Sequence, residues 1–383
     1  MKELQGELDR RREAGLYRRR RVIESAQGIE TRIDGKTLLS FCSNDYLGLA
    51  NHPDIKQACS AAVAEYGVGS GAAHLINGHS RLHEDCERRL AEFTGRDRAL
   101  LFPTGYMANL AIASTLPGRG DRVFQDRLNH ASLIDGARLG RARLVRYRHN
   151  DLDQLETLLR DSPSGHRRLV MTDGVFSMDG DCADLAALAR IAADNGAWLM
   201  VDDAHGFGVL GARGAGLLEQ LDLDQRQVPI LMATLGKAAG TAGAFVAGSE
   251  ALIETLIQQA RPYIYTTAAP PALAAATLKA LEIIETETWR REKLNQSIAY
   301  FRERAAAAGF EPSRSHTAIQ PLVIGDNHRA VQLGDALFER GIHVTAIRPP
   351  TVPEGSARLR VTLSALHELA HIDRLIDTFE SLS

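Results

Sequence analysis

The sequence predicts an α/β protein built on a mostly parallel sheet, and three observations lead to that prediction. From about residue 80, short apolar runs alternate with stretches of helical periodicity, which is typical of a sheet with helices on both faces. The runs at 198–201 and 230–232 are wholly apolar, as strands buried on both sides are. Polar residues follow both runs, at the strand ends where such sheets bind ligands.

The individual elements follow in order from this pattern. We expect strands at 38–41, 98–102, 122–125, 144–147, 169–172, 198–201, 230–232, 243–247, 318–324, before 346, and at 358–363. We expect helices at 3–21, from Pro53, at 81–94, 106–115, 152–159, 185–193, 249–261, 270–308 and 329–340, and at the end of the chain. These imply an N-terminal segment (1–45), a large domain (46–285) and a small α+β C-terminal domain (286–383).

Composition sets broad limits on the class of protein. The chain has 383 residues, 44% of them hydrophobic and 24% charged, which is ordinary for a soluble globular protein. A net charge of −3 argues against a nucleic-acid-binding protein. The charged N-terminus is unlike a signal peptide, and no apolar run is long enough to span a membrane. The four cysteines form no CxxC pair, so we expect neither a metal nor disulfides, and a cytoplasmic protein.

The residues around the strand at 230–232 suggest the chemistry. Lys237 follows Thr234-Leu235-Gly236 and precedes small apolar residues, so its amine has no charged neighbour in sequence. Burial lowers the pKa of such an amine and prepares it to form a Schiff base. Asp202 follows the run at 198–201, where a carboxylate can hold the ring nitrogen of pyridoxal 5′-phosphate (PLP). The alternative is a surface lysine and a solvated acid, which the apolar surroundings disfavour.

Three further places can contact the same ligand. Gly105 and Tyr106 open a helix whose N–H groups can receive a phosphate. His130 follows a strand; such a histidine is more often a capping or core residue, although its flat ring can stack on a heteroaromatic plane. Ser177 follows another strand end and can donate a hydrogen bond to a ligand oxygen. The glycine-rich stretch 67–73 is a weak signal by itself.

Arginines mark the two ends of the chain. Arg348 and Arg360 lie in or after strands, where each is either a surface residue or part of a carboxylate-binding pair. The cluster at 18–21 is either a solvated face or a contact for an anionic substrate or an acidic carrier protein.

Five motifs resemble those of the α-oxoamine synthases, which are fold-type I PLP enzymes related to aspartate aminotransferase. They are Ser-Asn-Asp-Tyr-Leu-Gly (43–48), His-Ala-Ser (130–132), Gly-Val-Phe-Ser-Met-Asp-Gly (174–180), Val-Asp-Asp-Ala-His-Gly (201–206) and Thr-Leu-Gly-Lys (234–237). The family condenses an amino acid with an acyl thioester. Segments 318–327 and 347–353 are most similar to the members that join L-alanine to a pimeloyl thioester, on acyl-carrier protein or coenzyme A, for biotin synthesis.

The resemblance implies roles for the matching residues. The catalytic ones would be Lys237, His130, Asp202 and His205. Those implied to contact PLP are Gly105, Tyr106, His130, Ser177, Asp202, His205, Thr234, Lys237 and Thr267. Thr267 would reach the partner subunit's phosphate, because family members are homodimers with shared active sites. Those implied to bind substrate are Arg18, Asn44, Arg348, Thr351 and Arg360.

The sequence departs from the family pattern in three places. The usual Gly-Ser-Gly-Gly-Ser becomes Gly-Ser-Gly-Ala72-Ala73 and is followed by His74, the usual glutamate before Gly174 is Asp173, and the glycine after the lysine is Ala238. The alternatives are another α-oxoamine synthase that uses glycine or serine, an aminotransferase, and a PLP-sensing regulator. The last would need a DNA-binding domain, for which we expect no room in the chain.

Overall fold

The structure is a computed structural model that describes residues 2–310 and 313–382. The chain forms two compact units. The sheet unit comprises His52–Phe176 and Cys182–Thr288, and the terminal unit comprises Met1–Asn51, Ser177–Asp181 and Trp289–Ser383. The three-part division expected from the sequence stays a prediction.

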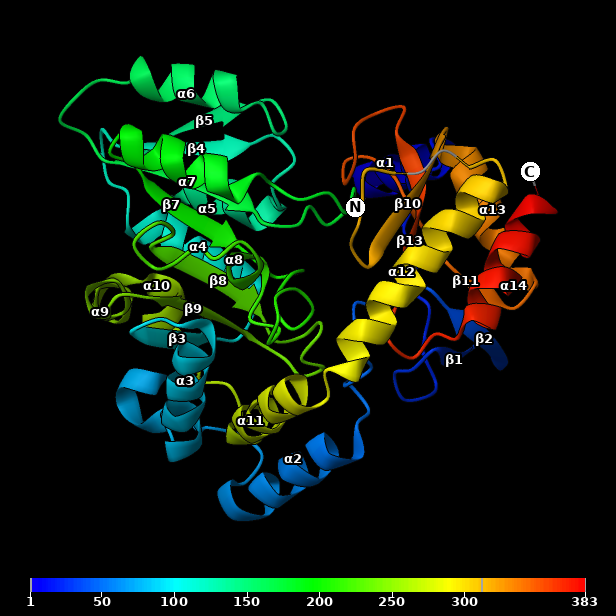
Figure 1. The fold of residues 1–383 in the computed structure, drawn as a ribbon, viewed down its shortest axis with the longest axis horizontal. Helices are drawn as coiled ribbons and strands as arrows, with labels where there is room; N and C mark the ends of the chain where they lie inside the picture. The colour runs from blue at the N-terminus through cyan, green and yellow to red at the C-terminus, as the bar shows by residue number, and fades with distance from the viewer. Residues whose placement is uncertain (1, 311–312, 383) are drawn as a thin grey trace. The chain divides into compact units, whose positions relative to one another are not determined.

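A seven-stranded sheet is the centre of the sheet unit, with strand order β3-β9-β8-β7-β6-β4-β5 (Figure 1). The strands are β3 (Arg98–Phe102), β4 (Arg122–Asp126), β5 (Arg143–Tyr147), β6 (Arg168–Asp173), β7 (Trp198–Asp202), β8 (Ile230–Thr234) and β9 (Ala244–Gly248). Strands β4 to β8 pair in parallel, and β9 runs antiparallel to both β8 and β3. The prediction of a mostly parallel sheet is therefore confirmed.

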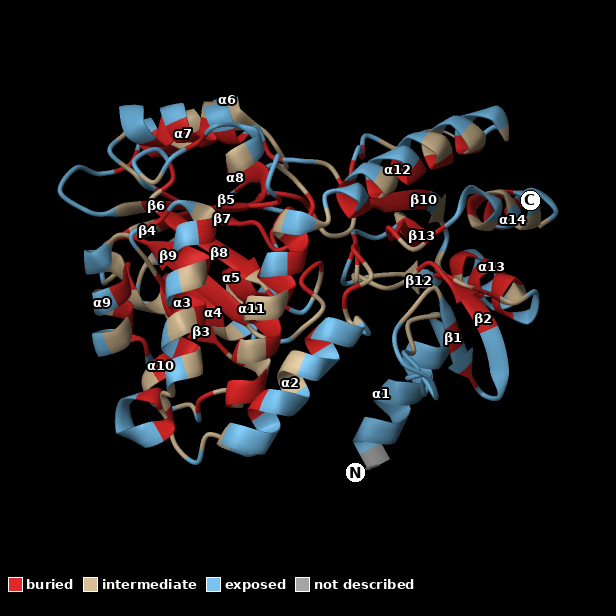
Figure 2. Ribbon diagram, turned by 60° about the horizontal axis from the view of Figure 1, so that its bottom comes forward, coloured by how far each residue is buried: buried red, intermediate tan, exposed pale blue. Residues whose placement is uncertain are grey.

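Helices cover this sheet and supply much of its buried core. They are α2 (Pro53–Tyr66), η1 (His74–Gly78), α3 (Arg81–Thr94), α4 (Gly105–Thr115), α5 (Ala131–Leu139), α6 (Leu152–Arg160), α7 (Leu185–Asp194), α8 (Leu217–Gln220), α9 (Glu250–Gln259), α10 (Arg261–Ile264) and α11 (Pro271–Thr286). Figure 2 shows the buried residues concentrated in the central strands. The apolar run of β8 is buried from Ile230 to Ala233, as a strand covered on both faces requires.

The described residues of the terminal unit form two small sheets and four helices. Its strands are β1 (Glu30–Ile33), β2 (Lys36–Ser40), β10 (Ile319–Gly325), β11 (Ile342–His343), β12 (Thr345–Ile347) and β13 (Ala357–Thr362). They form the sheets β1-β2-β11 and β10-β13-β12. The helices are α1 (Lys2–Glu13), α12 (Trp289–Ala307), α13 (Asn327–Glu339) and α14 (Leu369–Glu380).

Three helix predictions were wrong in extent. The helix expected at 3–21 ends at Glu13, because Gly15 adopts a positive φ of 65° and the chain then continues without helix. The helix expected at 249–261 ends at Gln259, and α10 starts anew with Pro262 in its first turn. The helix expected at 270–308 is two helices, because Glu287 leaves the helical conformation with ψ at 60°.

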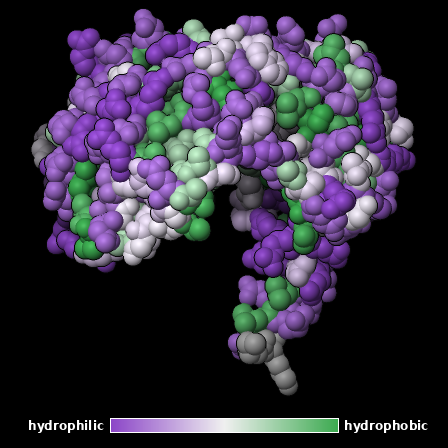
Figure 3. Space-filling model, turned by 90° about the horizontal axis from the view of Figure 1, so that it is seen from below, coloured by the Kyte–Doolittle hydropathy of each residue, from purple (hydrophilic) through white to green (hydrophobic). Residues whose placement is uncertain are grey.

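Other elements were not foreseen from the sequence: strand β1, helix α5 and the π-helical turn η1. No described helix is both long enough and apolar enough to cross a membrane. The face seen in Figure 3 is mostly hydrophilic, with hydrophobic side chains in small groups.

Candidate active site

Lys237 lies in the loop that follows β8, and its amine faces a histidine. The loop is held by the Thr234 hydroxyl, which donates to the carbonyl of Gly243 at 3.0 Å. The half-buried Lys237 places its Nζ 2.7 Å from Nε2 of His205, so the two nitrogens share a proton. His205 follows β7, the strand beside β8. The structure therefore brings together two residues that the sequence separates.

Asp202 is the last residue of β7 and is buried. Its Oδ1 accepts the N–H of Ala204 at 3.0 Å, and its Oδ2 accepts from Nδ2 of Asn109 at 2.8 Å. Neither donor is charged, and Asp202 forms no ion pair with any residue that the structure describes. A buried carboxylate without a cation is costly, so the site is suited to a ligand that carries a positive charge.

Asn109 was missed by the sequence analysis. It lies in α4, is almost fully buried, and also donates to the Ser132 hydroxyl at 2.9 Å. Its own Oδ1 is buried without a hydrogen-bond partner. An asparagine inside the apolar stretch of α4 is the sequence signal that could have marked it.

His130 caps helix α5, so the expectation of a capping residue is confirmed. Its backbone N–H donates to Oδ2 of Asp173 at 2.8 Å, and its Nδ1 lies 2.7 Å from the Ser132 hydroxyl. The surrounding protein atoms, with a further contribution from Lys237, lower the pKa of His130, although the residue is still exposed. Its ring is therefore neutral near pH 7 and free to stack on a planar ligand.

Asp173 and Asp203 are buried acids near Asp202, and the pKa of each is raised. Burial, together with the charge of Asp202, raises the pKa of Asp173 well above its usual range. Burial also raises the pKa of Asp203 to about 8. A Cβ on Gly206 or Gly216 would lie 2.1 or 2.0 Å from a carboxyl oxygen of Asp203, so these glycines make room for it. Burial thus favours the neutral form of both acids.

The start of α4 offers unused hydrogen-bond donors. The Thr104 hydroxyl accepts the N–H of Met107 at 3.2 Å, whereas the N–H groups of Gly105 and Tyr106 bond no described residue. These N–H groups and the positive end of the helix dipole are suited to an anion such as a phosphate. The Tyr106 hydroxyl donates to Asp135, and this hydrogen bond raises the pKa of Tyr106.

The departures from the family pattern have local explanations. Ala238 packs closely on Gly208: a Cβ added to Gly208 would lie 2.6 Å from the methyl group of Ala238. The carbonyl of Ala72 accepts the N–H of Ala268 at 3.0 Å, and Ala73 forms a β-bridge with Thr267. This bridge places the exposed Thr267 next to the glycine-rich stretch.

Arg360 and Asn44 form a second candidate site, in the terminal unit. Nη1 of Arg360 donates to Oδ1 of Asn44 at 3.2 Å, and its Nε donates to the carbonyl of Ser177 at 2.6 Å. This buried arginine also donates to the Thr362 hydroxyl. Among the described residues Arg360 therefore has only neutral oxygens as partners, and its charge is available to a carboxylate. Ser177 itself lies in the terminal unit, and its expected contact with PLP stays a prediction.

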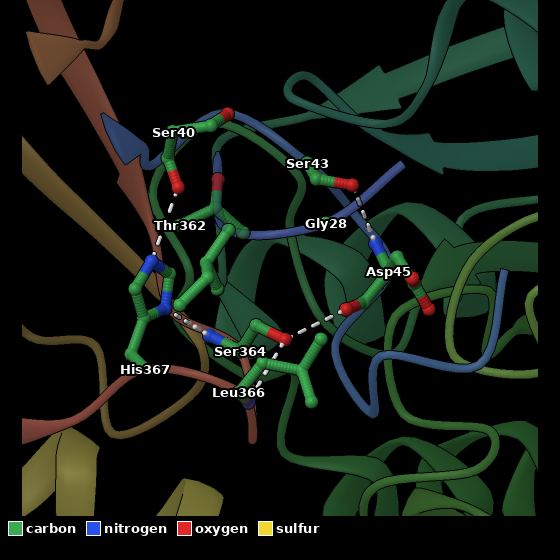
Figure 4. Close-up of a pocket in the computed structure, with 9 residues that line it drawn as sticks. Gly28, Ser40, Ser43, Asp45, Thr362, Ser364, Leu366 and His367 are labelled. Atoms are coloured by element: carbon green, nitrogen blue, oxygen red, sulfur yellow. Dashed lines mark hydrogen bonds between the residues drawn. The ribbon is translucent and has the colours of Figure 1, made fainter. Parts of the chain in front are cut away.

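A small pocket of the terminal unit is lined by Ser43 and Asp45, the sequence neighbours of Asn44, and by His367 (Figure 4). On its wall His367 accepts the N–H of Ser364 at Nδ1 and donates from Nε2 to the carbonyl of Ser40. The ring stacks on Phe41 with centroids 4.4 Å apart, and burial lowers the pKa of His367 to about 4. Because Ser364 also donates to the carbonyl of Asp45, His367 fixes the turn that carries Asn44.

The remaining predicted substrate residues also lie in the terminal unit. Arg18 donates to the Thr351 hydroxyl at 3.3 Å. Arg348 donates to the carbonyl of Gly15 at 2.6 Å and thus holds the segment before Arg18. Burial, with a contribution from Arg18, lowers the pKa of Arg348. Arg18 and Arg348 are therefore neighbouring cations whose hydrogen-bond partners are neutral, so an anionic group can bind to them.

Comparison with known proteins places the chain in a family. A model of class I and II aminotransferases matches residues 36–379. The 8-amino-7-oxononanoate synthases of Pseudomonas entomophila and Nitrosococcus oceani are 60% and 59% identical to it, over 98% and 97% of this chain and 96% and 98% of theirs. The chain belongs to the 8-amino-7-oxononanoate synthase family. It is a PLP-dependent acyltransferase of biotin biosynthesis.

Solved structures confirm the fold of this synthase family for the chain. Serine palmitoyltransferase from S. paucimobilis, with bound PLP and myriocin, superposes with a TM-score of 0.94 at 32% identity, covering 99% of this chain and 96% of that one. The 8-amino-7-oxononanoate synthase of Francisella tularensis gives 0.79 at 35% identity, over 90% and 97%. The predicted fold-type I architecture and the predicted cofactor are therefore confirmed.

The sheet unit offers each group that PLP requires. Lys237 supplies an amine for the aldehyde, and Asp202 supplies a carboxylate without a cationic partner for the ring nitrogen. The N–H groups of Gly105 and Tyr106 are unused donors for the phosphate. His130 supplies a neutral ring for stacking. The residues present fit the cofactor.

Proposed function

We propose that this synthase joins L-alanine to a pimeloyl thioester, carried by acyl-carrier protein or coenzyme A, and releases carbon dioxide and the thiol. The curated relatives carry the name of the enzyme that makes 8-amino-7-oxononanoate. The single observation that supports an amino acid as substrate is Arg360, a buried cation whose described partners are all neutral oxygens. The carboxylate of alanine would supply the negative charge that pairs with Arg360.

The proposed roles divide between the two candidate sites. Lys237 binds the aldehyde of PLP, Asp202 pairs with its ring nitrogen, and His130 stacks on the face of its ring. Gly105, Tyr106 and Thr234 lie at the phosphate end, with Thr267 serving the partner subunit. His205 and Ser177 contact the phenolic oxygen. Asn44 and Arg360 bind the amino-acid carboxylate, and Arg18, Arg348 and Thr351 contact the acyl substrate.

The protein's own groups move one proton in the central step. Bound PLP stores the electron pair that remains when the Cα–H bond of alanine breaks. The Lys237 amine takes this Cα proton as general base, and its neighbour His205, at 2.7 Å, can accept or return a proton at Nε2. Asp202, held by Asn109 and by the N–H of Ala204, would place its carboxylate at the ring nitrogen. Lys237 later returns a proton to the product carbon.

We also propose a cytoplasmic homodimer. Several large apolar side chains near the glycine-rich stretch are exposed, notably Ile76 at 77%, Val68 at 76% and Tyr265 at 70%. Covering such side chains favours association with a second copy. All four cysteines are free thiols, which suits a reducing compartment. Light scattering on the purified holoenzyme tests the dimer, and a monomeric mass would exclude it.

A substrate panel tests the reaction. The holoenzyme is mixed with single amino acids, with and without pimeloyl thioesters, while thiol and carbon dioxide are measured. We expect release of both only with alanine and the thioester together. A preference for glycine or serine would assign another α-oxoamine synthase activity. Conversion of bound PLP to pyridoxamine phosphate with a keto acid would indicate an aminotransferase.

The attachment of PLP is tested separately at Lys237. Borohydride treatment followed by peptide mapping should place the cofactor on Lys237 and on no other lysine. Lys237→Ala removes both the attachment point and the base, so we expect activity to fall at least about 10²- to 10⁴-fold. Circular dichroism should show the same fold, and retained turnover would identify a different base.

A further inference from the structure

Three histidines of the sheet unit face one another outside the groups assigned to PLP. His74 begins η1, directly after the unusual Ala72-Ala73 pair, and His79 and His83 follow. The ring centroids of His74 lie 5.1 Å from those of both other histidines. One ring nitrogen of each residue lies within 4.8 Å of the others. His74 and His83 are buried and His79 is half-buried.

The outer hydrogen bonds fix which nitrogens carry protons. Nε2 of His83 lies 2.7 Å from the carbonyl of Ala269, which can only accept, so this nitrogen carries the hydrogen. Nε2 of His79 lies 3.2 Å from a carboxylate oxygen of Glu84, which likewise calls for a hydrogen there. In neutral rings the lone pairs of His79 and His83 are therefore on Nδ1. Metal-binding histidines are oriented in the same way by carbonyls and carboxylates.

The third ring completes the arrangement. Nδ1 of His74 lies 2.8 Å from Nδ1 of His79, so the two nitrogens share one proton in a hydrogen bond. Without that proton, each nitrogen has a lone pair that can bind a metal. The His74 ring stacks on Tyr263 with centroids 5.1 Å apart, which holds it beside the other two histidines. One ring nitrogen of each of the three histidines thus lies within 4.8 Å of the others.

We propose that one ring nitrogen from each of His74, His79 and His83 binds a divalent transition-metal ion, with Zn²⁺ as the best match. Three neutral imidazoles and a solvent molecule form a tetrahedral zinc site with Zn–N distances of about 2.0–2.1 Å. Binding displaces the proton held between His74 and His79, and the two rings move apart by less than about 1 Å to make room. If His83 binds through Nδ1, it exchanges its hydrogen bonds with the N–H and the hydroxyl of Ser80 for the metal.

Such an ion would be structural. It would link η1 to α3. Both of these regions already contact segment 267–269, through the Ala73–Thr267 bridge and through the hydrogen bond from His83 to the carbonyl of Ala269. The sequence analysis expected no metal because it considered the cysteines alone. The proposal does not depend on the reaction assigned above, because none of the three histidines has a role in it.

Metal titration of the untagged holoenzyme tests the site. After removal of metals with a chelator and gel filtration, Zn²⁺ is titrated calorimetrically, and Co²⁺ is added to a second sample for its visible spectrum. We expect one ion per chain, a tetrahedral Co²⁺ spectrum without a thiolate charge-transfer band, and a rise in melting temperature. A thiolate band or the lack of any stoichiometric binding would overturn the proposal.

Variants locate the ion. His79→Ala, at the half-buried position, should abolish the stoichiometric binding and the rise in melting temperature. Glu84→Gln should weaken binding about 10- to 100-fold by releasing the orientation of His79. His316→Ala, an exposed histidine on the terminal unit, is the matched control and should bind as the wild type does. Unchanged affinity in His79→Ala, with a native circular dichroism spectrum, would refute the assignment.

Discussion

Asp202 in the sheet unit and Arg360 in the terminal unit are both buried charges, and they have opposite signs. Asp202 has the side-chain amide of Asn109 and a backbone N–H as partners, and Arg360 has two carbonyl or amide oxygens and a hydroxyl. By contrast, the buried Arg358, two residues from Arg360, pairs with Asp179. A charge left with neutral partners indicates where the protein expects a ligand to supply the opposite charge.

The two sites differ in how they are supported. Asp202 is held by hydrogen bonds from α4 and from the N–H of Ala204, and it lies beside two acids whose pKa burial raises. Arg360 is held by hydrogen bonds that connect β13 and the following Ser364 to the turn at 43–48. The anionic site thus lies among other acids, whereas the cationic site depends on the position of a turn. The following variants test that difference, beginning with the largest expected effect.

Asp202→Asn removes the negative charge and keeps the shape. We expect PLP to bind more weakly and activity to fall by about 10²-fold or more, because the ring nitrogen loses its charged partner. The measurements are PLP affinity and turnover. Asp126→Asn, at the end of β4, is the control: its carboxylate accepts backbone N–H groups, so this change should lower stability and leave the cofactor spectrum unaltered.

Arg360→Gln removes the positive charge of the other site. We expect the KM for alanine to rise about 10- to 100-fold, because hydrogen bonds to a charged group are lost. PLP affinity should not change. Arg358→Gln is the matched control on the same strand, since its charge is already paired with Asp179. If both variants raise the KM for alanine equally, the distinction between paired and unpaired charge is wrong.

His367 tests the geometric support of the cationic site. Glutamine can replace the Nε2 donor to the Ser40 carbonyl, whereas asparagine can replace only the Nδ1 acceptor. We therefore expect His367→Asn to raise the KM for alanine about 2- to 10-fold and His367→Gln to raise it less, with kcat nearly unchanged.

His371→Gln is the control for this pair of variants, because His371 makes a similar capping bond to Glu368 away from the turn. Equal KM values for the glutamine and asparagine variants would show that the bond to Ser40 does not position Asn44.

Asp203→Asn should have the smallest effect on catalysis and a clear effect on pH dependence. The pKa of Asp203 is about 8 in the folded protein and about 4 in the unfolded chain, so the wild type loses stability as pH rises between these values. Asparagine cannot ionise, so the stability of the variant relative to the wild type should increase from pH 5 to pH 8.5. Chemical denaturation measures this, and a constant difference across pH would mean that Asp203 is charged when folded.

The sequence predicted best what depends on local pattern. Lys237 and Asp202 were found because each follows a fully apolar strand, and neighbouring parallel strands end at the same edge. Asn109 was missed, because its contact with Asp202 depends on how α4 packs on the sheet. The pair Asn44 and Arg360 is separated by 316 residues, and no periodicity reveals such a contact. The resemblance to a family supplied that pair, and the structure shows its geometry.

The end of helix α1 and the π-helical turn were not predicted for a related reason: both depend on backbone conformations that the residue pattern does not show. The stop at Glu13 requires the positive φ of Gly15, which a pattern of charged residues does not show. Likewise the π-helical turn at 74–78 has no periodic signal, so the convergence of His74, His79 and His83 could not be expected from spacing alone.

The terminal unit is assembled from both ends of the chain, and this has a consequence for folding during synthesis. Strand β2 pairs in parallel with β11, and Cys42 donates to the carbonyl of His343, 301 residues away. At usual translation rates the ribosome needs about 15–60 s to make that intervening stretch. During this time β2 can pair with β1 but its other edge still lacks β11, whereas all seven strands of the larger sheet are made before residue 250. The N-terminal segment must therefore wait, exposed to chaperones, until nearly the whole chain has been translated.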